Sequence, residues 1–196
     1  MKNYVEKTII GKVNEMLSRK KKQKFVWNDS IYEDLKIYLS IDERGQLGEE
    51  IIYDICKDIS GLNIEYDSSV TDNEKGYDII INNKKVEVKT ATITSGSGMF
   101  QHEHLEAQRD YDYILFLDIA PNEVFLTLTK KQDVMWRRKK GDPANKTAIH
   151  RRPNGDYKCD FTIKHIKNNG IPKFRNFKTS QIKIKQDIIN IIKHIL

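Results

Sequence analysis

Two short runs of β-forming residues on either side of Asn82-Asn83 constrain the fold of this chain more than any other feature. The runs are 77–81 (YDIII) and 85–90 (KVEVKT), and both are rich in β-branched and aromatic residues. Asparagine tolerates a positive φ, so Asn82-Asn83 suits the two-residue turn of a β-hairpin. The hairpin predicts three cross-strand pairs: Ile81 with Lys84, Ile80 with Lys85, and Ile79 with Val86.

The same turn predicts that Asp78 lies directly opposite Glu87. Cross-strand partners have Cβ atoms roughly 4.5–5.5 Å apart, so both carboxylates can reach one cation. Side chains alternate between the two faces of a strand, which puts Lys89 on the face of Glu87, while Val86 and Val88 face the core. Two acids this close repel each other unless a bound cation compensates. The hairpin therefore predicts a metal site.

Hard oxygen ligands on a rigid strand pair suit Mg²⁺, or Mn²⁺ in its place, with water and substrate phosphate filling the remaining positions. A lysine beside that metal can orient the attacking water and stabilise charge on phosphoryl oxygens. The alternative is the solvated polar face of an ordinary amphipathic hairpin. The acidic-x-Lys spacing recurs at 34–36 and 156–158, but neither segment has an acid opposite it across a tight turn.

Two motifs of this hairpin resemble the signature of the PD-(D/E)XK nuclease superfamily: Gly76-Tyr77-Asp78, in place of its Pro-Asp pair, and Glu87-Val88-Lys89-Thr90. The resemblance implies an α/β, restriction endonuclease-like fold, a mixed β-sheet flanked by helices, over about 42–129. It implies that Asp78, Glu87 and the Val88 carbonyl bind Mg²⁺ and that Lys89 positions the water. In-line attack would leave a 5′-phosphate. The nearest type is a type II restriction endonuclease that acts as a homodimer on double-stranded DNA.

The resemblance also implies a helix before the hairpin with an acidic residue aimed at the site. The segment 45–50 (GQLGEE) opens a helix in which Glu49 and Glu50 are both candidates. Glu49 lies near the edge of the apolar stripe of that helix and Glu50 nearly opposite, so Glu49 is the candidate for the outer metal shell. The alternative is a glutamate favoured by the helix dipole. The stripe comprises Leu47, Ile51, Ile52, Ile55, Cys56 and Ile59.

A further helix is expected over 100–109. In many restriction endonuclease-like proteins a polar residue on the next helix points back at the catalytic strands, and Gln101 matches that placement. His102 and His104 suggest zinc as an alternative, but two residues apart on a helix they diverge by roughly 200°, which is poor for sharing a metal. Both histidines are therefore expected at the surface, at most as contacts to DNA phosphates.

Charge divides the chain into two parts. Residues 1–129 hold 16 Lys and Arg against 23 Asp and Glu, a net −7, and residues 130–196 hold 18 against 5, a net +13, which together give +6. A basic part is expected where nucleic-acid phosphates are neutralised. We expect the 137–140 run to contact phosphates and Arg151-Arg152 to read bases; the alternative is a solvated charge run. The predicted DNA-contacting residues are Arg137, Arg138, Lys139, Lys140, Arg151 and Arg152.

The length suits a single nuclease domain over 1–196, with a catalytic core at about 42–129 and a basic DNA-binding part at about 130–196. Cys56 and Cys159 are expected as core thiols of a cytoplasmic protein, and no apolar run is long enough for a membrane span. The expected helices are 3–22, 30–39, 43–60, 100–109 and 179–195, and the last could pack on the sheet or form a dimer contact. The expected strands are 62–67, the 77–93 hairpin, 112–119, 123–129 and 157–166.

Two rival functions stay open. One is another nuclease of the same fold, such as a Holliday-junction resolvase or a repair or recombination nuclease. The long basic segment favours a site-specific enzyme, because a resolvase needs mainly a flat basic surface. The other is a non-catalytic DNA-binding protein in which Asp78, Glu87 and Lys89 only decorate a hairpin.

Overall fold

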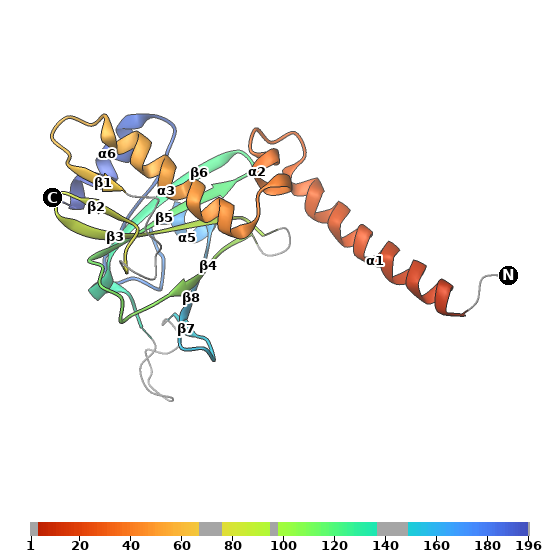
Figure 1. Ribbon diagram of the computed structural model, residues 1–196. Helices are drawn as coiled ribbons and strands as arrows, with labels where there is room; N and C mark the ends of the chain where they lie inside the picture. Colours follow the sequence, from red (N-terminus) through yellow and green to blue (C-terminus); the bar gives the residue numbers. More distant parts are fainter. Residues whose placement is uncertain (1–3, 67–75, 95–97, 137–148, 196) are drawn as a thin grey trace.

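A computed structural model describes residues 4–66, 76–94, 98–136 and 149–195 (Figure 1). The helices are α1 (Tyr4–Trp27), α2 (Glu33–Tyr38), α3 (Ile41–Lys57), η1 (Lys131–Asp133), α5 (Ile163–Lys167), α6 (Lys185–Ile192) and η3 (Lys193–Ile195). The strands are β1 (Ile64–Tyr66), β2 (Ile79–Ile81), β3 (Lys84–Thr92), β4 (Met99–Leu105), β5 (Tyr113–Ala120), β6 (Glu123–Lys130), β7 (His150–Arg151), β8 (Tyr157–Thr162) and β9 (Lys178–Gln181).

The large sheet has the order β1-β2-β3-β5-β6-β9. It is mixed, because β3 and β5 run parallel while the other neighbours are antiparallel. Every residue of β5 is buried, as expected of a central strand covered on both faces. A second, antiparallel sheet has the order β4-β8-β7. The prediction of a mixed α/β architecture with helices on the sheet is confirmed.

The predicted hairpin forms with the predicted turn. Asn82 and Asn83 have φ angles of 50° and 62°, the positive values that a two-residue hairpin turn of type I′ requires. The three expected pairs form in register: Ile79 with Val86, Ile80 with Lys85, and Ile81 with Lys84. Turn chemistry thus sets which β3 residue lies opposite each β2 residue.

The prediction of a helix over 100–109 is wrong, because the segment forms strand β4. Phe100 and His102 are buried and Gln101 between them is exposed, which is the period of a strand rather than of a helix. The register shifts between His102 and Leu105, where His104 has a φ of 58°, so the strand contains a bulge. The parallel connection from β3 to β5 therefore passes through the second sheet.

Helix α3 lies against β3 and begins with a capping box, in which Ser40 and Glu43 exchange side-chain to backbone hydrogen bonds. Its buried residues are Gly48, Ile52 and Cys56, so the apolar stripe predicted for this helix faces the sheet. The close approach of α3 to β3 requires a glycine at position 48, since a Cβ there would lie 1.7 Å from Oγ1 of Thr90.

The C-terminal predictions need correction. The strand expected over 157–166 ends at Thr162, whose side chain caps α5. The closing helix expected over 179–195 begins only at Lys185, because 178–181 pairs with β6 as β9. Helix α6 buries Ile188, Ile191 and Ile192, so its apolar face packs on the molecule itself. That contact removes α6 as the dimer surface that the sequence suggested.

Helix α1 continues to Trp27, beyond the predicted end at residue 22, and Trp27 is buried in the core. The helix extends away from the two sheets (Figure 1). The exposed apolar side chains among its described residues include Ile10, Val13, Met16, Leu17 and Val26. Among the described residues, no helix combines the length and the apolar character that crossing a membrane requires.

Candidate functional site

Asp78 precedes β2 at a break in the ladder with β3. The ladder ends at the pair Ile79–Val86, one pair before the predicted pairing of Asp78 with Glu87. The N–H of Asp78 donates to the carbonyl of Val86 at 3.1 Å, so Asp78 and Ile79 both oppose Val86. Two residues opposite one define a β-bulge, a feature that redirects a side chain.

The bulge turns the Asp78 carboxylate toward the backbone of β3. Oδ2 of Asp78 accepts a hydrogen bond from the N–H of Val88 at 2.5 Å, and the side chain is buried. In an extended strand the N–H and C=O of one residue point to the same edge, so the Val88 carbonyl also points toward Asp78. The predicted ligands Asp78 and Val88 therefore meet at one edge of β3, through a bulge that the sequence did not indicate.

Glu87 is the most deeply buried acid of the predicted site, with none of its surface exposed. Lys89 Nζ lies 2.6 Å from its Oε1, but neither carboxylate oxygen accepts a hydrogen bond of good geometry from the described residues. The ion pair holds without a well-aligned hydrogen bond, because charge attraction tolerates poor angles. A buried carboxylate with this little solvation is costly, so the site favours a further cation.

Lys89 connects this buried acid to a large cleft. Its side chain is 17% exposed and lines a cavity of about 1100 Å³ beside α3, β3 and β4. Glu49, Val88 and Gln101 line the same cavity. The structure thus brings Lys89, Glu49 and Gln101 to one cleft, with Asp78 and Glu87 buried and Glu87 in contact with Lys89.

The two glutamates in the middle of α3, Glu49 and Glu50, have different surroundings. Glu49 lines the cleft and hydrogen-bonds with Tyr66. Burial raises the pKa of Tyr66 to about 12, and the negative charges of Glu49, Glu50 and Asp78 add to the shift. Glu50 is exposed and accepts a hydrogen bond from Gln46 at 2.9 Å. Of the two glutamates, Glu49 is the one that lines the cleft.

The expectation that His102 lies at the surface is wrong. Its side chain is fully buried, Nδ1 lies 3.0 Å from the carbonyl of Cys159, and Nε2 lies 2.7 Å from Oδ1 of Asp118. The ring stacks on Phe161 at 4.8 Å between centroids. The alternation of β4 places His102 inside, and this buried pair joins the second sheet to β5. Cys159 is also buried, as predicted.

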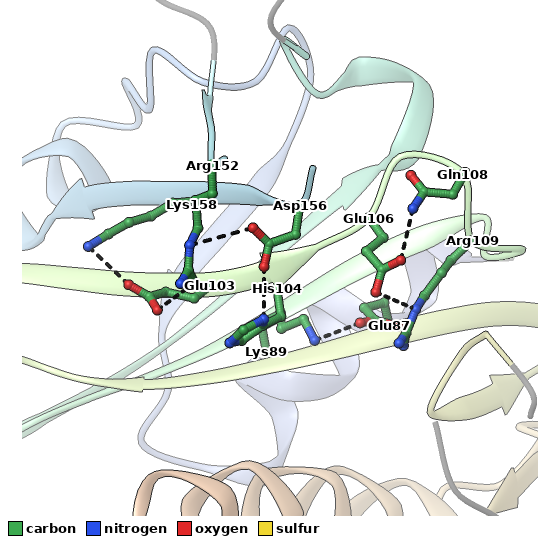
Figure 2. A network of polar contacts seen from close by, with 10 residues as sticks. All are labelled: Glu87, Lys89, Glu103, His104, Glu106, Gln108, Arg109, Arg152, Asp156 and Lys158. Atoms are coloured by element: carbon green, nitrogen blue, oxygen red, sulfur yellow. Dashed lines mark hydrogen bonds and ion pairs between the residues drawn. The ribbon is translucent and has the colours of Figure 1, made fainter. Parts of the chain in front are cut away.

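A row of polar side chains follows β4 toward Lys89 (Figure 2). Nδ1 of His104 lies 2.8 Å from Oδ2 of the buried Asp156. Arg152 and Lys158 both contact Glu103, at 2.8 Å and 3.2 Å. Sequence reasoning missed the pair of His104 and Asp156, because it assigned the histidine to a helix and treated 156–158 only as a spacing without context.

The predicted DNA-contacting residues divide into two groups. Arg151 is exposed on β7, whereas Arg152 is held by its ion pair with Glu103 and lies 3.5 Å from Oδ1 of Asp156. The other four, Arg137, Arg138, Lys139 and Lys140, lie outside the described residues.

The residues that the structure describes contain no group of three or more His, Cys, Asp and Glu side chains arranged around one metal position. Magnesium does not require such a group, since it commonly binds through one or two carboxylates together with waters and substrate phosphates. Two buried acids beside a backbone carbonyl match that smaller set. The donor types at Asp78, Glu87 and Val88 therefore fit Mg²⁺ or Mn²⁺.

No family model matches this chain, and no curated protein matches its sequence.

Proposed function

We propose that this protein is a magnesium-dependent deoxyribonuclease that hydrolyses phosphodiester bonds of double-stranded DNA. The observation that carries the proposal is Glu87, a wholly buried carboxylate whose only ion-pair partner among the described residues is a lysine that lines a large cleft. A buried acid of this kind stabilises neither the core nor the surface by itself. It gains a role when a divalent cation binds.

In this proposal Asp78, Glu87 and the Val88 carbonyl hold the cation. When bound, Mg²⁺ would act as a Lewis acid on the phosphoryl oxygens and lower the pKa of a bound water. The bulge at Asp78 fixes one carboxylate against the Val88 N–H, so that ligand needs little reorganisation. Glu49, at the cleft wall, lies where it can accept hydrogen bonds from water around the metal.

Lys89 has a separate role in this mechanism. Its ammonium lies against Glu87 and lines the cleft, so it can orient the attacking water and stabilise negative charge on the scissile phosphate. Gln101, exposed on β4 in the same cleft, can donate a hydrogen bond to the substrate. In-line attack of water on phosphorus would break the bond to the 3′-oxygen and leave a 5′-phosphate.

The order of elements supports a restriction endonuclease-like nuclease. Helix α3 precedes the strands β1, β2 and β3, and β5 returns parallel to β3. The acidic residue expected before the hairpin is Glu49 on α3. We propose a type II restriction endonuclease, in which Arg151 reads bases and Arg152, fixed by Glu103, supports the same surface. A resolvase or repair nuclease of the same fold would use the same site.

A homodimer remains part of this proposal. The apolar face of α6 is covered within the chain, so a dimer contact has to lie elsewhere. The exposed apolar side chains of α1 supply an alternative surface for a second copy of the chain. Sedimentation of the purified protein should give the mass of two chains. A protein that stays monomeric at all concentrations would contradict the proposed homodimer.

Incubation with a mapped plasmid tests the function. We expect cleavage with Mg²⁺ or Mn²⁺, binding without turnover in Ca²⁺, and no cutting in excess chelator. Discrete fragments would support a site-specific enzyme, whereas cutting only of branched junctions would support a resolvase. Glu87→Gln should abolish cleavage, and the matched variant Glu50→Gln should cleave like the wild type. DNA binding without cleavage under every condition would show a non-catalytic binding protein and overturn the proposal.

A further inference from the structure

Two cations line the cleft at some distance from the acidic pair. Lys36 of α2 donates from Nζ to Oγ1 of Thr92 at 3.1 Å, and Arg44 of α3 donates from Nη1 to the carbonyl of Leu39 at 3.1 Å. Both side chains are partly buried and both line the cavity that contains Lys89. Spacing along the chain does not connect Lys36 with the site, because Lys36 is 56 residues from Thr92.

Within the described ranges, both cations donate hydrogen bonds to neutral acceptors. Among the residues described, no carboxylate lies within ion-pair distance of Lys36 or Arg44. Two acids in the same cleft have cations of their own: Glu103 contacts Arg152 and Lys158, and Glu106 contacts Arg109. Asp42 and Glu49 also line this cleft, but in the described part of the chain neither Lys36 nor Arg44 has an ion-pair partner.

Burial disfavours the charged form of both groups. Burial lowers the pKa of Lys36, and the nearby positive charge of Arg44 lowers it further. Burial also lowers the pKa of Arg44. Two like charges that are partly removed from water destabilise the folded chain unless an anion joins them. The pair thus has the opposite requirement to Glu87, which favours a cation.

We propose that Lys36 and Arg44 form a binding subsite for a backbone phosphate of the nucleic acid that occupies the cleft. The proposal rests on the proposed function, because it places the DNA strand across Lys89. A guanidinium and an ammonium on adjacent helices suit a phosphate, which accepts several charge-assisted hydrogen bonds at once.

Thr92 places this subsite relative to Lys89. Both residues lie on β3 and line the cleft, but they are three positions apart, so their side chains leave opposite faces of the strand. The phosphate at Lys36 and Arg44 would therefore be a different one from the scissile phosphate at Lys89.

The first test measures DNA binding without cleavage. Wild type, Lys36→Gln, Arg44→Gln and the double variant are titrated against a fluorescent duplex in Ca²⁺ over a series of salt concentrations. We expect the double variant to bind roughly 10-fold more weakly at low salt, with a salt slope lower by about one, as for the loss of one phosphate contact. Lys57→Gln is the matched control, since Lys57 lies exposed at the far end of α3, and it should bind like the wild type.

The second test locates the phosphate. Duplexes carry a single neutral methylphosphonate at successive positions on either side of the cut. Neutralising one position other than the scissile phosphate should weaken binding by the wild type and have no further effect on the double variant. Inorganic phosphate at millimolar concentration should not displace the duplex; displacement abolished by the double substitution would assign the subsite to a free anion instead and overturn the proposal.

Thermal unfolding checks that the variants fold, and we expect no loss of stability. Equal affinity, slope and methylphosphonate sensitivity in wild type and double variant would overturn the subsite. That outcome differs from failure of the proposed function, in which the wild type itself would not cleave DNA with any metal.

Discussion

Nζ of Lys89 lies 2.6 Å from Oε1 of Glu87 on one face of β3, and the carboxylate is wholly buried. The lysine compensates part of the charge of Glu87 and also lines the cleft. In the nuclease that we propose, a bound metal would give the carboxylate a second cation, and Lys89 could then contact water or phosphate in the cleft.

Glu87→Gln separates metal binding from folding. The amide keeps the shape of the side chain and removes a buried charge, so the variant should be at least as stable as the wild type without metal. Metal should stabilise only the wild type, by about 2.7 kcal/mol at a concentration 100 times its Kd. Thermal unfolding with and without Mg²⁺ measures both effects. Equal stabilisation of the two proteins by Mg²⁺ would place the metal elsewhere.

Lys89→Ala should lower kcat by roughly 10²–10³-fold, the usual cost of one charge-stabilising donor in an active site. DNA affinity in Ca²⁺ should change little, because other cations of the cleft remain. Lys158→Ala is the matched control, since Lys158 contacts Glu103 and Asp160 on the second sheet rather than the acidic pair. Single-turnover cleavage rates would show the difference. A Lys158→Ala variant that folds but is inactive would indicate that the active site lies at β8 instead.

Gly48→Ala should destabilise the protein by about 1–3 kcal/mol, because the new methyl group would lie 1.7 Å from Oγ1 of Thr90 and force α3 away from β3. Gly45→Ala, three residues earlier on the same helix, has open space around its Cβ and should gain up to about 1 kcal/mol from helix propensity. Urea denaturation of both variants measures the contrast. A neutral Gly48→Ala would contradict the packing of α3 on β3.

Asp118 should make stability depend on pH in the acid range. Burial raises the pKa of this carboxyl, although His102 opposes the shift. A carboxyl whose pKa is higher in the folded than in the unfolded chain contributes stability below its unfolded pKa, about 3.9, and loses it as pH rises through the folded value. Relative to Asp118→Asn, the wild type should lose up to about 1.4 kcal/mol per pH unit there. A constant difference between the two proteins from pH 3.5 to 7 would contradict this.

The sequence predicted those parts of the fold that depend on local chemistry. Asn82-Asn83 predicted the hairpin and its register. The apolar stripe of α3 predicted which face of the helix packs on the sheet. Both signals lie within a few neighbouring residues of the sequence. The segment 100–109 was assigned to a helix because a short run with two histidines hides its alternation. Only its pairing with β8, about 60 residues later, shows that it is a strand.

Contacts within the site also divide into those that local sequence predicts and those that depend on distant residues. The contact of Glu87 with Lys89 follows from the alternation of β3, but the predicted pairing of Asp78 with Glu87 does not form, because a bulge redirects Asp78 to the Val88 N–H. The contacts of Lys36 with Thr92 and of His104 with Asp156 join residues more than 50 positions apart. Spacing along the chain carries no signal for such pairs, so only the folded arrangement places them in or beside the cleft.

The most direct test of the central claim is the binding of Mn²⁺ to the pair of Asp78 and Glu87. Electron paramagnetic resonance counts the Mn²⁺ ions bound to the protein in the presence of a short duplex. The account predicts that the wild type binds Mn²⁺ and cleaves, and that a variant with both Asp78→Asn and Glu87→Gln folds, binds the duplex, and has lost this ion together with cleavage. Equal Mn²⁺ binding by the two proteins would contradict the account.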